Sequence, residues 1–367
     1  MTALYLSSLT LSHFRSHKRA EVVADARPVA IYGPNGAGKT NLLEAVSLFS
    51  PGRGMRRAAA GDMTRRPEAL GWKVDGILHG VRQPHEISFQ SQDGAARSVK
   101  IDGKSATQTM LGQVARVLWL LPSMDRLWIE GAEGRRRFLD RMTLSFFPGH
   151  GDAVLAYEKA MRDRNRLLKD HVQDASWFHA LEVQMARAGV EIHANRQATL
   201  ARIAAAQDGA ATQFPAADLA LIHADGDLPE TEDSLQQALA ASRPQDYHAG
   251  RSLVGPHRAD LDASYAAKST PARECSTGEQ KALLISLILA NARALAADID
   301  MAPILLLDEV AAHLDPDRRA ALFDEICELG AQAWMTGTER SLFDHLGPRA
   351  QYLEVTQADT RSDVRAA

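Results

Sequence analysis

The chain has 367 residues and a formal net charge of −4; 45% of its residues are hydrophobic and 24% are charged. These values are typical of a soluble globular protein, and the negative charge excludes a uniformly basic surface, so any DNA contact must use local patches. The two cysteines, Cys275 and Cys327, argue against a disulfide scaffold and favour a reducing compartment.

The N-terminal elements are predicted to be strands. Apolar residues recur from Ala3 to Phe14 in the pattern of a strand, and a shorter strand from Ala20 to Val23 follows. The first residues lack the basic and continuous apolar regions of a secretory signal. No run approaches the roughly 18 apolar residues that a membrane-spanning helix needs. We therefore expect a cytoplasmic protein without a membrane partner.

A glycine-rich loop follows these strands. The stretch from Ile31 to Val46, IYGPNGAGKTNLLEAV, contains the phosphate-binding pattern G-x-x-x-x-G-K-[ST] between an apolar strand and an apolar helix. Lys39 is expected to reach the outer phosphates of a nucleotide, and the Thr40 hydroxyl is expected to hold Mg²⁺. A glycine-rich turn with a chance lysine is the alternative, and the strand–helix context disfavours it. The expected nucleotide contacts are Gly33, Pro34, Asn35, Gly36, Ala37, Gly38, Lys39, Thr40 and Asn41.

Basic residues gather just after this helix. The cluster comprises Arg53, Arg56, Arg57, Arg65 and Arg66. A run of charge is usually a solvated face, but arginines of this kind can also contact DNA phosphates, so we treat them as candidate DNA contacts.

The middle of the chain changes from strands to helices. Residues 71–106 are predicted to be antiparallel strands, and Val114 to Leu121 is predicted to be a buried strand. From about Gly131, apolar residues recur at helical spacing in two long segments, which predict a pair of packed antiparallel helices.

The second half of a nucleotide site lies near the C-terminus. Met301 to Val310, MAPILLLDEV, predicts a parallel strand covered on both faces and ending in two acids. Asp308 is expected to hold Mg²⁺, and Glu309 is expected to orient the attacking water as the catalytic residue. The alternative, a pair of acids that merely caps a helix, is disfavoured by the phosphate loop upstream.

Ser276-Thr-Gly-Glu-Gln280 resembles the signature of ABC-type ATPases. A serine and a glycine at a helix start form a second phosphate-binding end, and in such ATPases this end acts on the nucleotide of another subunit. The expected contacts are Ser276, Gly278, Glu279 and Gln280, with Asp315 from the segment after the acids. Thr336 or Thr338 occupies the usual place of a switch histidine, so the γ-phosphate sensor stays open.

Several segments together resemble the RecF family of bacterial recombination mediators and gap-repair ATPases. They are Phe14-Arg-Ser-His17, GPNGAGKTNLLEA, Gly52 to Arg57, GRRRFLD, Tyr157 with Arg164-Asn165, Gly255-Pro-His-Arg258, the signature, and LLLDEV with LDPDRR. The resemblance implies that Arg15 and Ser16 contact the nucleotide. The chain departs from the family at Glu309, where many members carry Asp, and in STGEQ, where SQGQQ is commoner; both departures bear on the hydrolysis rate.

The resemblance also implies a fold and a function. The expected fold is an α/β, ABC-type (SMC/Rad50-like) P-loop ATPase head, residues 1–109 and 250–367, with an inserted, mainly helical second lobe, residues 110–249. The expected function is a weak, Mg²⁺-dependent ATPase that dimerises on ATP, binds DNA at single-strand gaps and helps to load recombinase. The implied partners are RecR- and RecO-type mediators and a RecA-type recombinase.

Two other functions remain as alternatives. A tethering ATPase of the SMC, Rad50 or RecN type needs a long heptad coiled coil, whereas the 236 positions between Thr40 and Ser276 contain ordinary helices. A transporter subunit places its signature much closer to the phosphate loop, which disfavours that function too.

Overall fold

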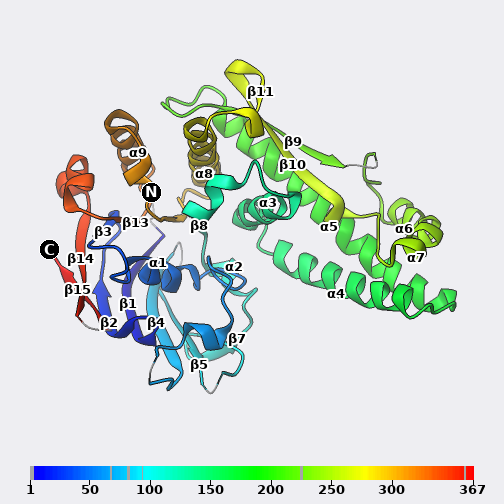
Figure 1. Ribbon diagram of the computed structural model, residues 1–367, viewed down its shortest axis with the longest axis horizontal. Coiled ribbons are helices and arrows are strands. Elements are labelled where there is room, and N and C mark those ends of the chain that lie inside the picture. Colours follow the sequence, from blue (N-terminus) through cyan, green and yellow to red (C-terminus); the bar gives the residue numbers. More distant parts are fainter. Residues whose placement is uncertain (1–3, 67, 81–82, 93, 224–225, 359–360) are drawn as a thin grey trace. The chain divides into compact units, whose positions relative to one another are not determined.

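The computed structural model describes residues 4–66, 68–80, 83–92, 94–223, 226–358 and 361–367. The chain divides into two compact units (Figure 1). Unit 1 comprises Met1–Asp125, Gly209–Pro215 and Lys281–Ala367, and unit 2 comprises Arg126–Asp208 and Ala216–Gln280. These divisions do not coincide with the predicted boundaries after residues 109 and 249, because strand pairing assigns segments near both boundaries to the other unit.

Unit 1 contains two six-stranded sheets, ordered β2-β1-β4-β5-β6-β7 and β15-β14-β3-β13-β12-β8. The strands of the first sheet are β1 (Tyr5–Phe14), β2 (His17–Val23), β4 (Trp72–His79), β5 (His85–Ser91), β6 (Ser98–Ile101) and β7 (Lys104–Ala106). Those of the second are β3 (Val29–Tyr32), β8 (Val117–Leu120), β12 (Ile304–Leu307), β13 (Ala333–Gly337), β14 (Gln351–Ala358) and β15 (Arg361–Ala366). The helices are α1 (Lys39–Ser47), α2 (Leu111–Val114) and α9 (Pro316–Glu328), with 3₁₀ turns at Ala60–Met63, Ala311–His313 and Arg340–Arg349.

The second sheet positions the nucleotide site. Strands β14, β3, β13, β12 and β8 pair in parallel, so their carboxyl ends share one edge, while β15 returns antiparallel to β14. The predicted apolar strand is confirmed as β12, and all four of its residues are buried as expected for a parallel strand covered on both faces. Because β8 pairs with β12, residues 117–120 belong to unit 1, not to the helical lobe.

The first sheet is antiparallel and shows the predicted alternation. In β1 the buried positions include Leu6, Leu9, Leu11 and Phe14; the first predicted strand residue, Ala3, lies outside the described residues. These side chains share one core cluster with α1 and the second sheet, so burial holds the phosphate loop between two sheets.

Unit 2 is mainly helical. Its helices are α3 (Ala132–Phe146), α4 (His150–Lys169), α5 (Ala175–Gln207), α6 (Glu232–Ala241) and α7 (Arg243–Ala249), with 3₁₀ turns at Pro256–Arg258, Ala266–Lys268 and Ala272–Glu274. Its strands are β9 (Ala217–His223), β10 (Ala259–Tyr265) and β11 (Thr270–Pro271), in the order β11-β10-β9. The predicted pair of long helices is α4 and α5, which pack around Tyr157, Met185 and Ile192. Because β10 pairs with β9, residues 259–265 belong to this unit.

Two further segments cross the unit boundary. The 3₁₀ turn Pro122–Arg126 contains one boundary, and helix α8 (Thr277–Ile299) begins in unit 2 and continues into unit 1. By length and composition alone α8 could cross a membrane, but 72% of its most apolar window is buried inside the structure. The burial is that of a core helix of a folded domain.

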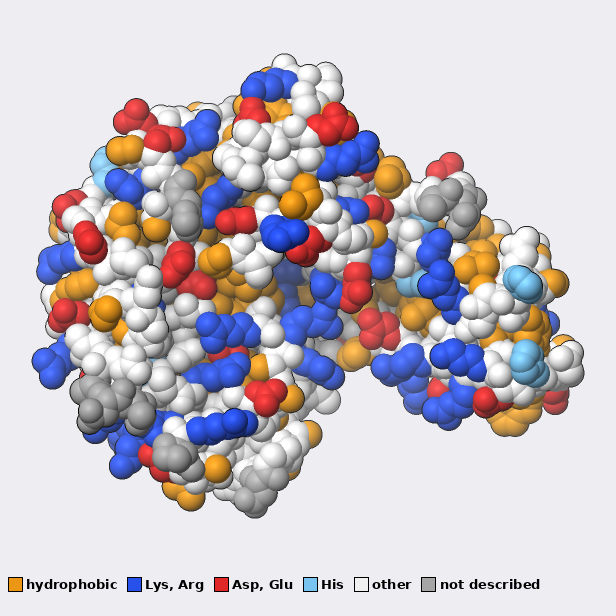
Figure 2. Space-filling model, viewed as in Figure 1, with side chains coloured by type: hydrophobic (Ala, Val, Ile, Leu, Met, Phe, Trp, Pro, Cys, Tyr) orange, Lys and Arg blue, Asp and Glu red, His pale blue; other side chains and the backbone are white. Residues whose placement is uncertain are grey.

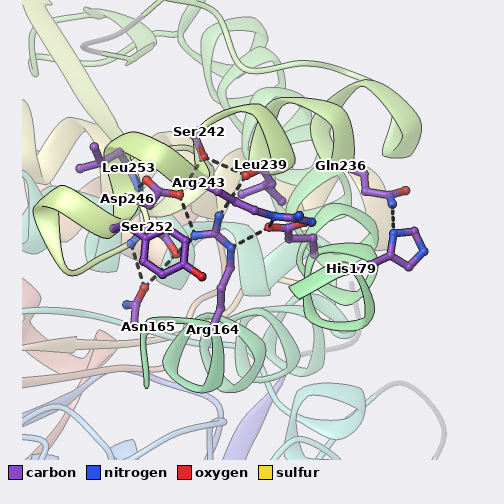
Figure 3. Close-up of polar contacts among 12 residues, drawn as sticks. Arg164, Asn165, His179, Gln236, Leu239, Ser242, Arg243, Asp246, Ser252 and Leu253 are labelled. Atoms are coloured by element: carbon purple, nitrogen blue, oxygen red, sulfur yellow. Dashed lines mark hydrogen bonds and ion pairs between the residues drawn. The ribbon is translucent and has the colours of Figure 1, made fainter. Parts of the chain in front are cut away.

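A buried network of hydrogen bonds and ion pairs connects the helices of unit 2 (Figure 3). Arg164 is fully buried, and its Nε donates to Glu182 Oε1 (3.1 Å) while one Nη lies 2.7 Å from Asp246 Oδ2. Arg243 also donates to Glu182 Oε1 (2.9 Å), and the Ser252 backbone N–H donates to Asn165 Oδ1 (2.8 Å). Each buried charge is therefore paired, which offsets the cost of removing it from water.

The segment GPHR, which is one of the motifs that resemble the RecF family, contacts the same network through Ser252. Tyr157 donates its hydroxyl proton to His257 Nδ1 (2.7 Å), because His257 Nε2 donates to the Ser252 carbonyl (3.0 Å). Burial lowers the pKa of His257 to about 4, which keeps the ring neutral. Gly255 has φ 133°, and a Cβ there would lie 2.0 Å from the Tyr157 hydroxyl oxygen. These motif residues serve the packing of unit 2.

Candidate nucleotide-binding site

The predicted phosphate loop joins β3 to α1 in unit 1. Gly33 has φ 146°, and a Cβ there would lie 2.0 Å from the Val355 carbonyl oxygen of β14. Gly38 has φ 104°, and a Cβ there would lie 2.6 Å from the hydroxyl oxygens of Ser16 and Ser362. Both positions therefore require glycine for two reasons, backbone conformation and space. The loop leads directly into the start of α1, whose first N–H groups have no partner within the helix.

Lys39 is buried and faces the loop from the first turn of α1. Its ammonium group donates to the carbonyl oxygens of Gly33 (2.7 Å) and Pro34 (2.9 Å). Burial lowers the pKa of Lys39, while the charges of Glu309 and Asp308 act in the opposite direction. The nearby acids thus favour the charged form of the lysine, which is the form that can bind phosphate.

The two predicted halves of the site meet at Asp308, at the end of β12. The Thr40 hydroxyl donates to Asp308 Oδ1 (2.9 Å), across 268 positions of sequence. The Thr336 hydroxyl, from the end of β13, donates to the same oxygen (2.8 Å) and accepts from the Glu309 backbone N–H (2.8 Å). Glu309 has φ 54°, an uncommon conformation for glutamate, so the Thr336 hydroxyl supports a strained position.

This arrangement fits Mg²⁺ and a nucleoside triphosphate. A threonine hydroxyl and an aspartate carboxylate are oxygen ligands of the kind that Mg²⁺ prefers, and they lie within hydrogen-bond distance of each other. Thr40 and Asp308 would hold the ion, and Lys39 and the loop amides would hold the phosphates. When bound, the ion would neutralise charge on the phosphates, and Glu309 would orient water.

Thr338 differs from Thr336. Thr338 is exposed just beyond β13, whereas Thr336 is fully buried and both of its hydroxyl interactions are with the acidic segment. Of the two threonines left open by the sequence, Thr336 supports the acids and Thr338 alone is placed to meet solvent or a ligand.

Arg15, a predicted nucleotide contact, is ion-paired within the protein. Its Nε and Nη2 donate to the two carboxylate oxygens of Glu44 (2.9 and 2.6 Å), and its Nη1 donates to the Asp62 carbonyl oxygen (2.7 Å). Glu44 lies on α1, is 1% exposed and also contacts Arg56 Nη1 (3.3 Å). No motif in the sequence predicts a role for Glu44, although an acid among the apolar residues of LLEAV is a local signal for it.

Ser16, the other predicted contact, belongs to a small polar cluster beside Gly38. It accepts from Asn41 Nδ2 (2.7 Å) and from the hydroxyl of Ser362 in β15 (2.7 Å). His17 Nε2 donates to the Gly38 carbonyl oxygen (3.1 Å), and burial lowers the pKa of His17. Ser362 and His17 were missed, and no local pattern in the sequence marks Ser362, which lies 346 positions from Ser16.

The signature segment in unit 2 forms a closed turn at the start of α8. The backbone N–H and the hydroxyl of Ser276 both donate to Glu279 Oε2 (2.9 and 2.7 Å), and Lys268 pairs with Glu279. Hydrogen bonds from Lys268 and Ser276 lower the pKa of Glu279 to about 2. Gln280 is buried and donates to the Cys275 carbonyl oxygen (2.9 Å), whereas Gly278 is exposed and open.

Asp315, predicted to contact nucleotide, caps α9 in unit 1. Its carboxylate accepts from the Arg318 backbone N–H (2.9 Å), and its side chain is exposed. Helix capping alone accounts for an aspartate at this position. A contact between Asp315 and the nucleotide stays a prediction.

The predicted DNA-contacting arginines differ in how available they are. Arg53, Arg57 and Arg66 are exposed, and Arg56 is exposed but contacts Asn41 (3.1 Å) and Glu44. Arg65 is 4% exposed and pairs with Glu68. Arg65 is therefore not a surface phosphate contact in this structure, because its guanidinium group is packed inside unit 1.

Comparison with known proteins places the chain in a family. Residues 5–361 match the model of the RecF/RecN/SMC N-terminal domain. The chain is 46% identical over 363 residues to the DNA replication and repair protein RecF of Rhizobium rhizogenes, covering 96% of this chain and 97% of that protein. The chain belongs to the RecF family. The RecF protein of Rhizobium meliloti is 45% identical over 363 residues, with the same coverage.

Solved structures agree with the fold of a RecF-family head. The chain matches a structure of the recombination mediator protein RecF with ATP, of the RecFOR pathway, at a TM-score of 0.84 and 22% identity, covering 99% of this chain and 98% of that one. An Smc head domain from Pyrococcus furiosus matches at a TM-score of 0.58 and 18% identity, covering 99% and 96%. The expected ABC-type, SMC-like ATPase head is thereby confirmed.

Proposed function

We propose that this chain is an ATP-switched DNA-binding protein of recombinational repair and replication restart. In this proposal, ATP and Mg²⁺ bind at the phosphate loop and Asp308, and two subunits pair through the signature. The paired form binds DNA at single-strand gaps and helps to load recombinase. Slow hydrolysis directed by Glu309 then releases the DNA.

The observation that carries the proposal is the meeting of Thr40 and Asp308 at 2.9 Å. A hydroxyl and a carboxylate from segments 268 positions apart converge beside a loop of phosphate-binding form, with Lys39 at its start. The relatives named DNA replication and repair protein RecF, and the solved RecF–ATP structure, support ATP as the ligand and repair as the process.

We also propose partners and a compartment. RecR- and RecO-type mediators are proposed as partners because the RecF–ATP structure is described within the RecFOR pathway. A RecA-type recombinase and a cytoplasmic location are proposed from the family alone. The predicted contacts Arg53, Arg57 and Arg66 would meet DNA phosphates, so sequence preference is expected to be weak.

The test is DNA binding with and without ATP. Fluorescence anisotropy on gapped, single-stranded and duplex DNA should show ATP-dependent binding that is tightest on the gapped substrate. Binding that is equal with and without ATP would contradict the switch, and tightest binding to plain duplex would contradict gap recognition.

A Lys39→Met variant tests whether the phosphate loop binds the nucleotide. Loss of the ammonium group removes the main counter-charge to the outer phosphates, so ATP binding measured by calorimetry, and with it ATP-dependent DNA binding, should be lost. Unchanged ATP affinity in this variant would overturn the assignment of the site.

A further inference from the structure

Helix α4 of unit 2 carries a basic stripe that no motif predicts. The stripe consists of Lys159, Arg162, Arg166 and Lys169, and all four side chains are exposed. At 3.6 residues per turn they fall within about 80° of arc on one side of the helix. Figure 2 shows Lys and Arg side chains gathered over the α4 region of unit 2, at the lower right of the view.

The stripe lies opposite the face that α4 buries. The buried side chains of this helix are His150, Ala153, Tyr157, Ala160, Arg164 and Leu168. From the helical repeat, the centre of the stripe is about 180° from the centre of this buried face. Glu158 and Asp163 lie at the two margins, so the middle of the solvent face is occupied by cations alone from residue 159 to residue 169.

The four cations of the stripe differ from several arginines of unit 1. Within the described part of the chain, none of the four side chains makes an ion pair or a hydrogen bond. Arg15, Arg56 and Arg65, by comparison, are committed to Glu44 or Glu68. A cation that is already paired gains less from a phosphate, so the stripe offers stronger phosphate contacts than Arg56 and Arg65, the two paired members of the predicted arginine cluster.

The spacing of the stripe suits a nucleic-acid strand. Lys159 and Lys169 are ten positions apart, which corresponds to about 15 Å along a helix at 1.5 Å per residue. Phosphates of one DNA strand advance about 3.4 Å each along the duplex axis and also wind around it, so a straight row of this length can face a few consecutive phosphates.

We propose that the α4 stripe is a second DNA-binding surface, which holds the sugar–phosphate backbone of DNA by charge. It rests on the proposed DNA-binding function and adds to it a surface in unit 2. The partner is DNA and not an acidic protein, because cations alone occupy this row over about 15 Å, which complements the unbroken negative charge of a phosphate backbone.

The experiment compares charge-removing with charge-conserving variants of the full-length chain. In the presence of ATP, Arg162→Gln with Arg166→Gln should weaken binding to single-stranded and duplex DNA by about tenfold or more. It should also reduce the slope of log affinity against log salt by about 2 on duplex. Adding Lys159→Gln and Lys169→Gln should bring the reduction to roughly 3 to 4. ATP affinity and DNA-free hydrolysis should not change.

Two controls separate charge from structure. Arg162→Lys with Arg166→Lys keeps the charge and should bind DNA as the wild type does. Arg187→Gln with Arg251→Gln removes two exposed charges elsewhere in unit 2 and should leave the salt slope unchanged. Equal loss in the control pair, or loss in the lysine variant, would overturn the proposal.

The results distinguish a failure of the stripe proposal from a failure of the proposed function. If the wild type binds DNA with ATP and the fourfold glutamine variant binds it with the same affinity and salt slope, the stripe is overturned and the function stands. An acidic protein partner would give this same result. If the wild type binds no DNA with ATP, the proposed function itself fails, and the stripe proposal fails with it.

Discussion

Thr336 links the two acids of the nucleotide site to the neighbouring strand. Its hydroxyl donates to Asp308 and accepts from the Glu309 backbone N–H, both at 2.8 Å. Valine has the same shape but can do neither, so in a Thr336→Val variant both acids lose their support.

We predict that Thr336→Val retains ATP affinity in the absence of Mg²⁺, loses most of the Mg²⁺ enhancement of binding, and hydrolyses ATP about tenfold or more slowly. Calorimetry with and without Mg²⁺ and a steady-state ATPase assay measure these effects. Thr336→Ser keeps the hydroxyl and should restore both. A valine variant with normal turnover and a normal Mg²⁺ effect would show that the hydroxyl has no positioning role.

Glu44 is a buried carboxylate held by two arginines. It is 1% exposed and contacts Arg15 and Arg56. Because the substitution leaves the partly buried Arg15 without its counter-charge, Glu44→Gln should lower the free energy of unfolding by about 1–3 kcal/mol. Urea denaturation measures the change. Glu21→Gln removes an acid from an exposed pair with Arg19 and should change stability by less than about 1 kcal/mol; equal effects would contradict the prediction.

At the scale of elements, Asp140 ties three helices of unit 2 together. From α3 it accepts from Arg196 Nε of α5 (2.8 Å) and from His150 Nε2 of α4 (2.9 Å). Burial alone would raise the pKa of Asp140, but Arg196 and His150 outweigh it and lower the pKa to about 2. Because the folded-state pKa lies below the unfolded one, this stabilisation is present above about pH 4 and is lost as the pH falls towards 2.

We therefore predict that Asp140→Asn is less stable than the wild type at pH 7 by about 2 kcal/mol, and that the difference narrows between pH 4 and pH 2. Helical circular dichroism during urea unfolding, repeated across this range, tests the prediction. A difference that stays constant from pH 7 to pH 2 would show that the carboxylate charge does not contribute.

At the scale of the whole molecule, we expect the signature to act together with a second subunit. Ser276 opens α8 with its hydroxyl and N–H turned to Glu279, and in ABC-type ATPases this segment serves the nucleotide of a partner. Dimerisation driven by ATP is therefore the expected state change of the protein.

Sedimentation of two variants tests this expectation. Ser276→Arg should bind ATP with normal affinity but stay monomeric and lose hydrolysis, because the added side chain blocks the signature. Glu309→Gln should bind ATP, hydrolyse it at least about tenfold more slowly and accumulate as dimers. A wild type that sediments as a monomer with and without ATP would rule out the trans arrangement.

Much of the nucleotide site could be predicted from the sequence because its signals are local. The glycines, Lys39 and Thr40 lie within eight consecutive positions, and the acids end an uninterrupted apolar run. Such patterns depend on backbone conformation and strand burial over a few residues, so they can be recognised without knowledge of the rest of the fold. The strands β3 and β12 and the long helices α4, α5 and α8 were predictable for the same reason.

Only the tertiary structure decided which polar side chains meet. Glu44, Thr336 and Ser362 acquire their partners across tens to hundreds of positions, and a single sequence does not show which residues such long-range pairs join. Burial is decided in the same way: Arg65 and Arg53 look alike in the sequence, yet one is packed inside unit 1 and the other is exposed. The unit boundaries also depend on pairing, because β8 joins unit 1 through β12 and β10 joins unit 2 through β9. Local sequence determines the elements and the loop chemistry, whereas long-range packing determines which charges remain free to bind a ligand.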